Sequence, residues 1–321
     1  MSNKTTTAED RYEYISSQHG GYWRDDFIDH NYLYNLYFPP EDFFRHCAEN
    51  LHQLVLNYPV GQSEIAHLTS MLIQQSPEHI VVGNGAAEFI KIIAGMNRQM
   101  IVPVPSFNEY VNAAPAGKVI EFPLQAPTFQ LDIDSFAKEA IRREALIAVV
   151  VSPNNPTSLL VPKAELVRLL KKLADHNCML IVDESFIDFA ENGESESLEN
   201  DIGDFQNLAI VKSMSKAYGI CGIRIGYLLT ANADFRAQVQ QGLHIWNING
   251  FAEEFLRRVP QYVEQFKTSC KKVQEDRDEF YTLLSNIPGM VVYKPAANYI
   301  FCRLPDDGPS APEVTQRLFT V

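Results

Sequence analysis

The sequence has few of the features that would place it in a membrane, outside the cell or around a metal ion. Its first residues, M-S-N-K-T-T-T-A-E-D-R, contain no apolar stretch typical of a signal peptide, and no uncharged run approaches the roughly 20 residues of a membrane helix. The five cysteines are widely spaced with no Cys-x-x-Cys pair, which argues against a disulfide framework and a zinc site. We therefore expect a cytoplasmic protein with no metal and no membrane partner.

Positive charge is also scarce. The chain of 321 residues has 27 lysines and arginines against 40 acidic residues, for a net charge of −13. Nucleic acid and anionic membranes would be repelled at long range, so we expect a small-molecule partner and no nucleic acid. Hydrophobic residues make up 46% and charged residues 21%, as in folded globular proteins. No repeat or flexible linker divides the chain, which favours one continuous architecture.

Short apolar runs alternate with segments of helical periodicity between about residues 79 and 230. The apolar runs are H-I-V-V-G, M-I-V-P-V, L-I-A-V-V-V-S, M-L-I-V-D, L-A-I-V-K and I-G-Y-L-L-T. This alternation predicts an α/β fold with a mostly parallel sheet covered by helices on both faces. Ligands of such sheets bind at the carboxyl ends of the strands, so the segments that directly follow strands are the candidates for chemistry.

The two ends of the chain do not continue this alternation. Helical patterns around residues 252–286 lead to two further strand-like runs, V-V-Y-K-P and Y-I-F-C-R-L. We expect a large domain at 46–251, and a smaller α+β domain formed by 1–45 and 252–321. A helical pattern is still in progress at the last residues, so we also expect that the carboxyl-terminal part of the small domain is truncated.

The strongest motif is S-M-S-K-A-Y-G-I-C-G-I-R-I-G-Y, which follows the run L-A-I-V-K. Lys216 stands between small polar residues, and Arg224 follows eight residues later. Serine hydroxyls and a guanidinium are suitable donors to phosphate oxygens. Taken alone, the motif is equally well explained by a lysine on a glycine-rich turn.

Three weaker motifs also follow predicted strands. V-V-G-N-G-A-A-E-F-I turns from a strand into a helix, whose first backbone N–H groups can bind phosphate. V-V-V-S-P-N-N-P-T-S is alone no more than a turn, and Asp183 in L-I-V-D-E-S-F-I-D-F is alone no more than a helix cap or loop residue. A carboxylate in that position can, however, keep a pyridine nitrogen protonated.

These four segments, in this order and spacing, resemble fold-type-I pyridoxal-phosphate (PLP) enzymes of the class I and II aminotransferases. The resemblance covers roughly residues 15–305 and is closest to the branch of histidinol-phosphate aminotransferase and threonine-phosphate decarboxylase. It implies pyridoxal 5'-phosphate as cofactor, bound to Lys216 as a Schiff base. It also implies that Asp183 pairs with the pyridine nitrogen, so that Lys216 and Asp183 are the catalytic residues.

The resemblance further implies which residues hold the cofactor. Asn155 would bond the 3'-oxygen, and Phe107 in P-S-F-N-E-Y would stack on the ring, although plain core packing explains Phe107 as well. Tyr58 would reach the phosphate of a neighbouring subunit, which implies a homodimer with shared active sites. The phosphate group would be held by Gly85, Ala86, Ala87, Ser213, Ser215 and Arg224.

The sequence departs from the family pattern mainly on the substrate side. Phe186 stands where many relatives have a tyrosine that donates to the 3'-oxygen, and D-E-S-F-I-D-F is closer to the decarboxylases, as is His19-Gly20-Gly21. Ser158 replaces a glycine, and N-Y-L-Y-N-L-Y-F-P-P replaces an Asn-Pro-x-Gly stretch. The carboxyl-terminal arginine that grips a substrate carboxylate has no counterpart before Val321.

The resemblance leaves the reaction open between two outcomes. Transamination of a small amino acid, or of an amine bearing phosphate or phosphonate, is the commoner outcome in this branch and is the one we expect. Decarboxylation uses the same cofactor site with a different bond aligned for cleavage. A PLP-sensing regulatory module is a third interpretation, but Lys216 and Asp183 are both present and no basic DNA-binding domain accompanies them.

Overall fold

The computed structural model describes residues 8–17, 20–24, 26, 28–31 and 33–319. His19 of the His19-Gly20-Gly21 motif lies outside the described residues, so the structure does not test its predicted contribution.

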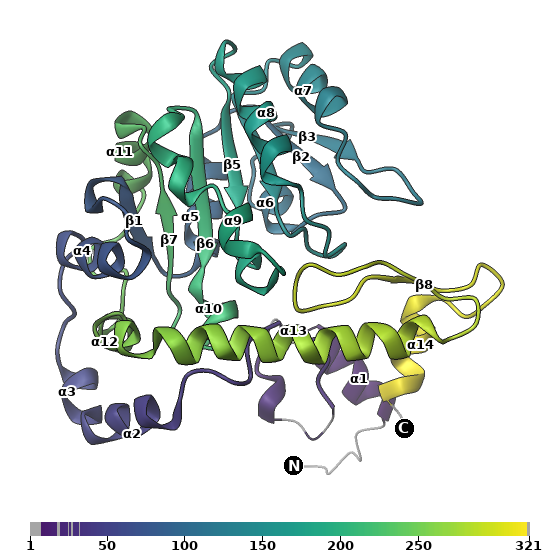
Figure 1. Cartoon of the computed structure of the whole chain (residues 1–321), viewed down its shortest axis with the longest axis horizontal. Coiled ribbons are helices and arrows are strands. Elements are labelled where there is room, and N and C mark those ends of the chain that lie inside the picture. Colours follow the sequence, from purple (N-terminus) through teal and green to yellow (C-terminus); the bar gives the residue numbers. More distant parts are fainter. Residues whose placement is uncertain (1–7, 18–19, 25, 27, 32, 320–321) are drawn as a thin grey trace.

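A seven-stranded sheet forms the centre of the molecule (Figure 1). Its strands are β1 (Ile80–Gly83), β2 (Met100–Val104), β3 (Val119–Pro123), β4 (Ile147–Val151), β5 (Met179–Asp183), β6 (Leu208–Ser213) and β7 (Gly226–Leu229). Their order is β1-β7-β6-β5-β4-β2-β3, and all neighbours are parallel except that β7 runs antiparallel to β1 and β6. The predicted α/β fold with a mostly parallel sheet is confirmed.

Six of the seven strands coincide with the apolar runs of the sequence. The exception is β3, whose run V-I-E-F-P contains Glu121 and was not predicted. Because β3 is the edge strand and is only partly buried, it tolerates a charged residue that a central strand would not.

Helices cover both faces of the sheet. One face packs against α4 (Gln62–Ile73), α7 (Ile133–Arg142), α8 (Lys163–Ala174) and α12 (Gly250–Arg258), and the other against α5 (Ala86–Gly95), α6 (Glu109–Asn112) and α11 (Ala233–Gln241). The further α-helices are α1 (Ala8–Ser16), α2 (Glu41–Glu49), α3 (Leu51–Leu56), α9 (Gly193–Glu196), α10 (Met214–Ala217), α13 (Val263–Ser285) and α14 (Ala311–Phe319). Short 3-10 turns are η1 (Tyr22–Arg24), η2 (Pro77–His79), η3 (Ile187–Phe189), η4 (Glu199–Asp204) and η5 (Val259–Tyr262).

The helix α8 illustrates how the sequence produces this packing. Leu166, Leu169, Leu170 and Leu173 recur at helical spacing and are all at most 1% exposed, because they lie on the face that packs against the sheet. Pro162 caps the amino terminus of the helix, close to where the sequence predicted the helix to begin.

The two ends of the chain meet beside the long helix α13. Figure 1 shows α1, α14 and the two-stranded sheet of β8 (Val291–Val292) and β9 (Cys302–Arg303) around its carboxyl-terminal half. The rings of Tyr12 and Phe319 are 5.4 Å apart, which joins α1 to α14. The boundaries of a large domain at 46–251 stay a prediction.

The pairing of the strands brings four chain segments to one edge of the sheet. Ser213 at the end of β6 lies opposite Gly226, which in turn lies opposite Gly83 at the end of β1. Asp183 at the end of β5 lies opposite Val151 at the end of β4. The segments that follow β1, β4, β5 and β6 therefore leave the sheet at a common edge, and these are the segments that carry the predicted site residues.

Within the described residues, every helix is too short or too polar to cross a lipid bilayer.

Candidate active site

The two predicted catalytic residues interact electrostatically. Lys216 lies in α10, the single turn after β6, and Asp183 is the last residue of β5 and 3% exposed. Burial raises the pKa of the Asp183 carboxyl above its usual value, while hydrogen bonds from Ser185 and Tyr110 and the charge of Lys216 act in the opposite direction. A buried carboxylate such as that of Asp183 can keep a nearby ring nitrogen protonated and can attract the resulting cationic ring.

Tyr110 contacts the candidate site, although the sequence analysis assigned it no role. It lies in α6, is fully buried, and donates a hydrogen bond of 2.9 Å from its hydroxyl to Asp183 Oδ2. The backbone N–H of Ser185 donates to the other oxygen, Oδ1, at 3.0 Å. The sequence signal that could have found Tyr110 is its place three residues after Phe107, just inside the helix that follows β2.

A candidate phosphate site forms where Gly85, Ser215 and Arg224 meet. Gly85 caps the amino terminus of α5 with φ +76°, and Arg224 donates to Ser215 Oγ at 3.2 Å. A Cβ atom on Gly85 would lie 2.6 Å from Arg224 Nη2, so glycine permits the guanidinium to approach the backbone. A helix amino terminus beside a guanidinium and a hydroxyl is suited to an anion such as phosphate.

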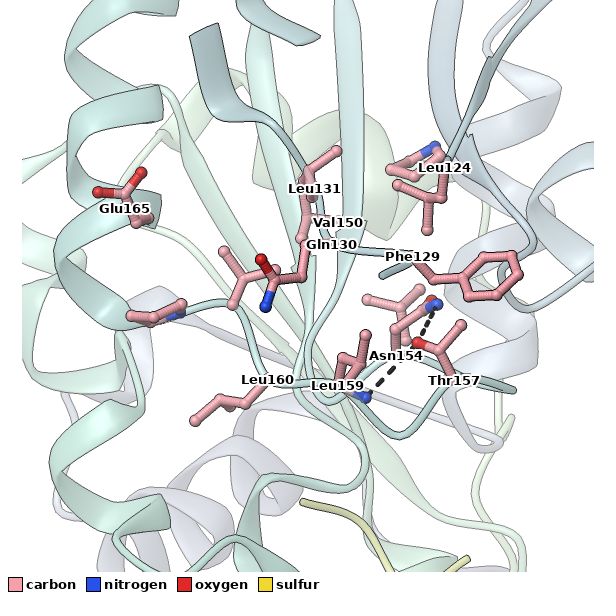
Figure 2. A pocket seen from close by; sticks show the side chains of 14 residues that line it. Leu124, Phe129, Gln130, Leu131, Val150, Asn154, Thr157, Leu159, Leu160 and Glu165 are labelled. Carbon is pink, nitrogen blue, oxygen red and sulfur yellow. Dashed lines mark hydrogen bonds between the residues drawn. The ribbon is translucent and has the colours of Figure 1, made fainter. Parts of the chain in front are cut away.

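The loop after β4 is held by the side chain of Asn154 (Figure 2). Its amide donates to Thr157 Oγ1 at 2.9 Å and to the carbonyl of Pro105 at 3.0 Å, and its oxygen accepts from Ser106 at 2.8 Å. Asn155 follows directly and is only partly buried. The sequence named Asn155 but missed that its neighbour Asn154 fixes the loop.

For the other predicted cofactor-binding residues, the structure gives a position in the fold but no contact that indicates a role. Ala86 and Ala87 begin α5, as expected for backbone donors, and Phe107 packs at the edge of the core beside α5 and α6. Ser213 ends β6, where its backbone N–H donates to Ser185 Oγ at 3.0 Å. Their contacts with a cofactor stay predictions.

Tyr58 is the predicted residue that the chain does not bring to the others. It is 76% exposed and its ring stacks on Trp246 at 4.3 Å. Among the described residues, no hydrogen bond or ring contact joins it to another predicted site residue.

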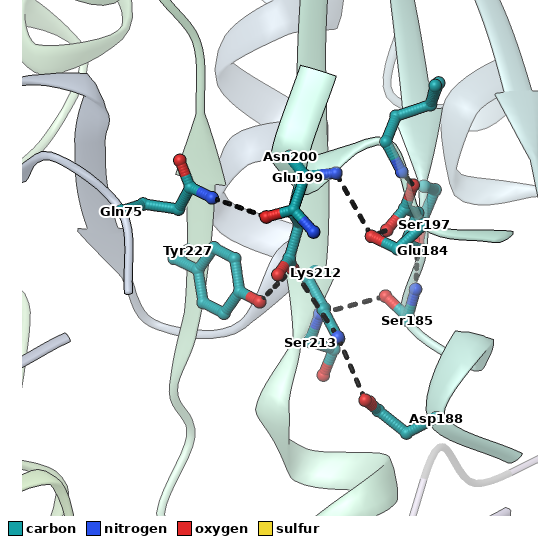
Figure 3. Close-up of polar contacts among 12 residues, drawn as sticks. Gln75, Glu184, Ser185, Asp188, Ser197, Glu199, Asn200, Lys212, Ser213 and Tyr227 are labelled. Atoms are coloured by element: carbon teal, nitrogen blue, oxygen red, sulfur yellow. Dashed lines mark hydrogen bonds and ion pairs between the residues drawn. The ribbon is translucent and has the colours of Figure 1, made fainter. Parts of the chain in front are cut away.

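A buried charge network surrounds Lys212 of β6 (Figure 3). Its side chain points to the sheet face opposite to that of Ser213, because successive residues of a strand alternate between faces. Lys212 pairs with Asp188 at 3.0 Å and with Glu199 at 3.5 Å, and Tyr227 donates to Glu199. Burial alone lowers the pKa of Lys212, but these acids raise it well above its usual value. Lys212 therefore stays charged and holds the segments after β5 against β6.

Glu184 belongs to the same network and follows Asp183 directly. It accepts hydrogen bonds from Ser197 Oγ at 2.6 Å and from the Leu198 N–H at 2.9 Å. Burial, and next the charge of Glu199, raises the pKa of Glu184 to about 7.

Two hollows lie near these residues but outside the predicted cofactor site. One, of about 360 Å³, is lined by Asn154, Thr157 and apolar residues such as Leu159 (Figure 2). The other, of about 980 Å³, lies between Lys212 and α13. Lys216 and Asp183 line neither.

Comparison with known proteins points to one enzyme family. The sequence model of "Aminotransferase class I and II" matches residues 56–320. CMP-5'-(3-aminopropyl)phosphonate synthase of Streptomyces rubellomurinus is 39% identical over 305 residues, which make up 95% of this chain and 48% of that protein. L-serine phosphate decarboxylase of Sulfurospirillum multivorans is 30% identical over 262 residues, 79% of this chain and 66% of that protein.

Solved structures similar to this chain include members of the same enzyme family. The solved structure of a decarboxylase from Sulfurospirillum multivorans gives a TM-score of 0.83 at 27% identity, covering 98% of this chain and 81% of that one. Histidinol-phosphate aminotransferases also match, so the predicted resemblance to this branch is confirmed. The chain spans about half the length of the phosphonate synthase and about two thirds of the serine phosphate decarboxylase.

The cofactor is pyridoxal 5'-phosphate, as predicted. The described residues fit it. The guanidinium of Arg224 lies directly against Gly85, where a Cβ would clash with it, so the cation and the first N–H groups of α5 are close enough to contact one phosphate. The Asp183 carboxylate accepts two hydrogen bonds from the protein, so it keeps acceptor capacity for a ring N–H.

The substitution Gly85→Ala tests the phosphate site. The new Cβ would displace the Arg224 guanidinium, and alanine at φ +76° costs about 1 kcal/mol of stability. We expect the dissociation constant of pyridoxal phosphate to rise by roughly ten-fold or more, as for loss of a charge-assisted contact. Gly95→Ala, in the last turn of the same helix with open space around it, is the control and should leave binding unchanged. Equal affinities in both variants would refute this phosphate site.

The substitution Glu184→Gln tests the network behind the site. The pKa of Glu184 is raised from 4.5 to about 7 in the folded protein, so its contribution to stability is present below pH 4.5 and is lost as pH rises towards 7. The loss is on the order of 3 kcal/mol. Chemical unfolding across this range should show wild type losing stability relative to Glu184→Gln, with Glu194→Gln, at an exposed position in α9, as control. A difference that is constant with pH would contradict the raised pKa.

Proposed function

Because the chain belongs to the class I and II aminotransferase family, we propose that it uses pyridoxal phosphate to remove the carboxylate of a small amino acid that carries a phosphate or phosphonate. The observation that carries this proposal is the names of two relatives at 30% identity or more, L-serine phosphate decarboxylase and CMP-5'-(3-aminopropyl)phosphonate synthase. An aminopropylphosphonate has an amine and a phosphonate but no carboxylate, as a decarboxylation product would.

The residues at the sheet edge are suited to this chemistry. Pyridoxal phosphate, when bound, supplies a ring that withdraws electrons from the carbon whose bond is broken. Asp183 would hold the proton on the ring nitrogen, since its carboxylate is buried and has Tyr110 and Ser185 as donors. Lys216 would hold the cofactor through Nζ until the substrate amine displaces it, and the freed Nζ would deliver a proton to the carbon that has lost carbon dioxide.

Phe186 also supports decarboxylation. It is 5% exposed, and its ring packs edge-on against Tyr299 at 5.0 Å. As a phenylalanine, it has no hydroxyl to donate at the position where many aminotransferases have a tyrosine. From the sequence alone we expected transamination, because it is the commoner reaction in this branch; the names of the relatives and the D-E-S-F-I-D-F motif now favour the lyase reaction.

Transamination is the second candidate, and the match of residues 56–320 to the aminotransferase family is the observation that favours it. In that reaction Lys216 would move a proton from the substrate carbon to the cofactor, and the amino group would stay behind for a second carbonyl substrate. Lys216 and Asp183 serve both reactions, so the outcome depends on which substrate bond is aligned for cleavage.

We also propose that the active protein is a homodimer in the cytoplasm. Leu56 and Tyr58 at the end of α3, with Ile245 and Trp246, form an apolar surface, each more than half exposed. A second chain covering this surface would bring Tyr58 to a neighbouring phosphate site. Sedimentation analysis should give a dimer that Leu56→Asp weakens; a monomeric wild type that binds the cofactor fully would contradict this assembly.

Product analysis separates the two reactions. Purified protein with pyridoxal phosphate should release carbon dioxide from phosphoserine or from 2-amino-4-phosphonobutyrate and keep the cofactor's absorbance band through many turnovers. Lys216→Ala should lose this activity by several orders of magnitude, and Lys267→Ala, an exposed lysine of α13, should retain it. If the absorbance band of the cofactor is instead lost after a single turnover, and further turnover needs an added keto acid, the reaction is transamination.

A further inference from the structure

Ser158 has a backbone conformation that is unfavourable for a serine. It is completely buried and has φ +59°, in the left-handed region that glycine adopts more readily. Glycine would relieve this strain, so the serine side chain needs a compensating interaction.

The hydroxyl of Ser158 provides such an interaction with a distant segment. Ser158 Oγ accepts a hydrogen bond from the N–H of Ala297 at 2.9 Å, and the Ser158 carbonyl accepts from the N–H of Ala296 at 2.8 Å. Ala297 is completely buried, so its N–H would have no access to water if the hydroxyl were lost. Two consecutive N–H groups are thus held by one residue of the loop after β4.

A second contact joins the same two segments on the other side of Asn155. The Tyr299 hydroxyl donates to the carbonyl of Asn154 at 3.0 Å, and this carbonyl also accepts from the N–H of Ser158 at 2.6 Å. We call the bonds from Ala296, Ala297 and Tyr299 to the 154–158 loop the Ser158 clasp. Asn155 lies between the two anchored ends of this loop.

The segment that contains Ala296 and Ala297 also contacts the long helix α13. Arg277 of α13, 9% exposed, donates from Nη1 to the carbonyl of Phe189 at 2.8 Å and lies 3.4 Å from the carbonyl of Ala296. Ala296 and Ala297 therefore have hydrogen-bond partners on both sides, Ser158 on one and Arg277 on the other.

We propose that Ser158 is a positioning residue: its hydroxyl fixes the loop that presents Asn155, so that affinity for pyridoxal phosphate depends on the contact with residues 296–299. This inference rests on the proposed use of pyridoxal phosphate and on the predicted bond from Asn155 to the 3'-oxygen of that cofactor. By linkage, a clasp that tightens cofactor binding by some factor must itself be tightened by the cofactor by the same factor.

Two substitutions separate the hydroxyl from the backbone strain. Ser158→Ala loses the hydroxyl and keeps the strain, whereas Ser158→Gly loses the hydroxyl and relieves the strain. Both should weaken binding of pyridoxal phosphate by roughly three- to ten-fold, as for one net hydrogen bond, although Ser158→Gly should unfold at the higher temperature. Glu144→Gly, at an exposed residue with φ +53°, relieves strain elsewhere and should leave binding unchanged.

Amide hydrogen exchange measures the linkage directly. In wild type, pyridoxal phosphate should slow exchange at Ala296 and Ala297, and this protection should be lost in Ser158→Gly. Wild-type affinity in Ser158→Gly, or exchange at these amides that is insensitive to the cofactor, would overturn the proposal. Both measurements report cofactor binding and amide exchange, so they remain valid if the reaction is not decarboxylation. If the expected binding and exchange are found but no carbon dioxide is released, only the proposed reaction is contradicted.

Discussion

A carboxylate is costly to remove from water, and Asp183 is almost completely buried at the end of a central strand. Its charge is supported by the Tyr110 hydroxyl, the Ser185 N–H and the field of Lys216. Each of these groups comes from a different segment that leaves the sheet at the same edge. The parallel pairing of β2, β4, β5 and β6 therefore sets the geometry of the site, since Tyr110 follows β2, Ser185 follows β5 and Lys216 follows β6.

The charges on the two faces of the sheet have separate tasks. On one face Asp183 and Lys216 form a site that can receive a charged ring. On the other, Lys212 neutralises Asp188 and Glu199, which both lie in the segment between β5 and β6, and thereby anchors that segment to β6. Adjacent residues of one strand point to opposite faces, so Lys212 and Ser213 serve these two tasks from neighbouring positions.

Much of this arrangement can be predicted from the sequence, because it depends on local patterns. The apolar runs identify six strands, and the candidate site residues stand at or after the ends of these runs, with Asp183 ending one and Lys216 and Arg224 following another. The contacts that complete the site depend on residues far apart in the chain, which no local pattern reports. Tyr110 is 73 residues from Asp183, and Tyr299 is 145 residues from Asn154. The antiparallel direction of β7 and the edge strand β3 were not predictable for the same reason, since both are set by pairing in space.

The sequence named Ser158 as a departure from the family and assigned the change to the substrate side. The structure gives it another partner, the segment at 296–297, and a strained backbone that a glycine would not have. Tyr58 is a different case, because its predicted partner lies on a second chain, and the exposed position of Tyr58 in one chain does not test that contact.

The most direct test of the central claim is to identify the lysine that binds pyridoxal phosphate. Reduction of the loaded protein with borohydride, followed by digestion and mass spectrometry, fixes the cofactor to the lysine that carries it. We expect the modification on Lys216, with neighbouring Lys212 unmodified because it is buried in ion pairs. Modification of Lys212 or of surface lysines alone would contradict the site described for this chain.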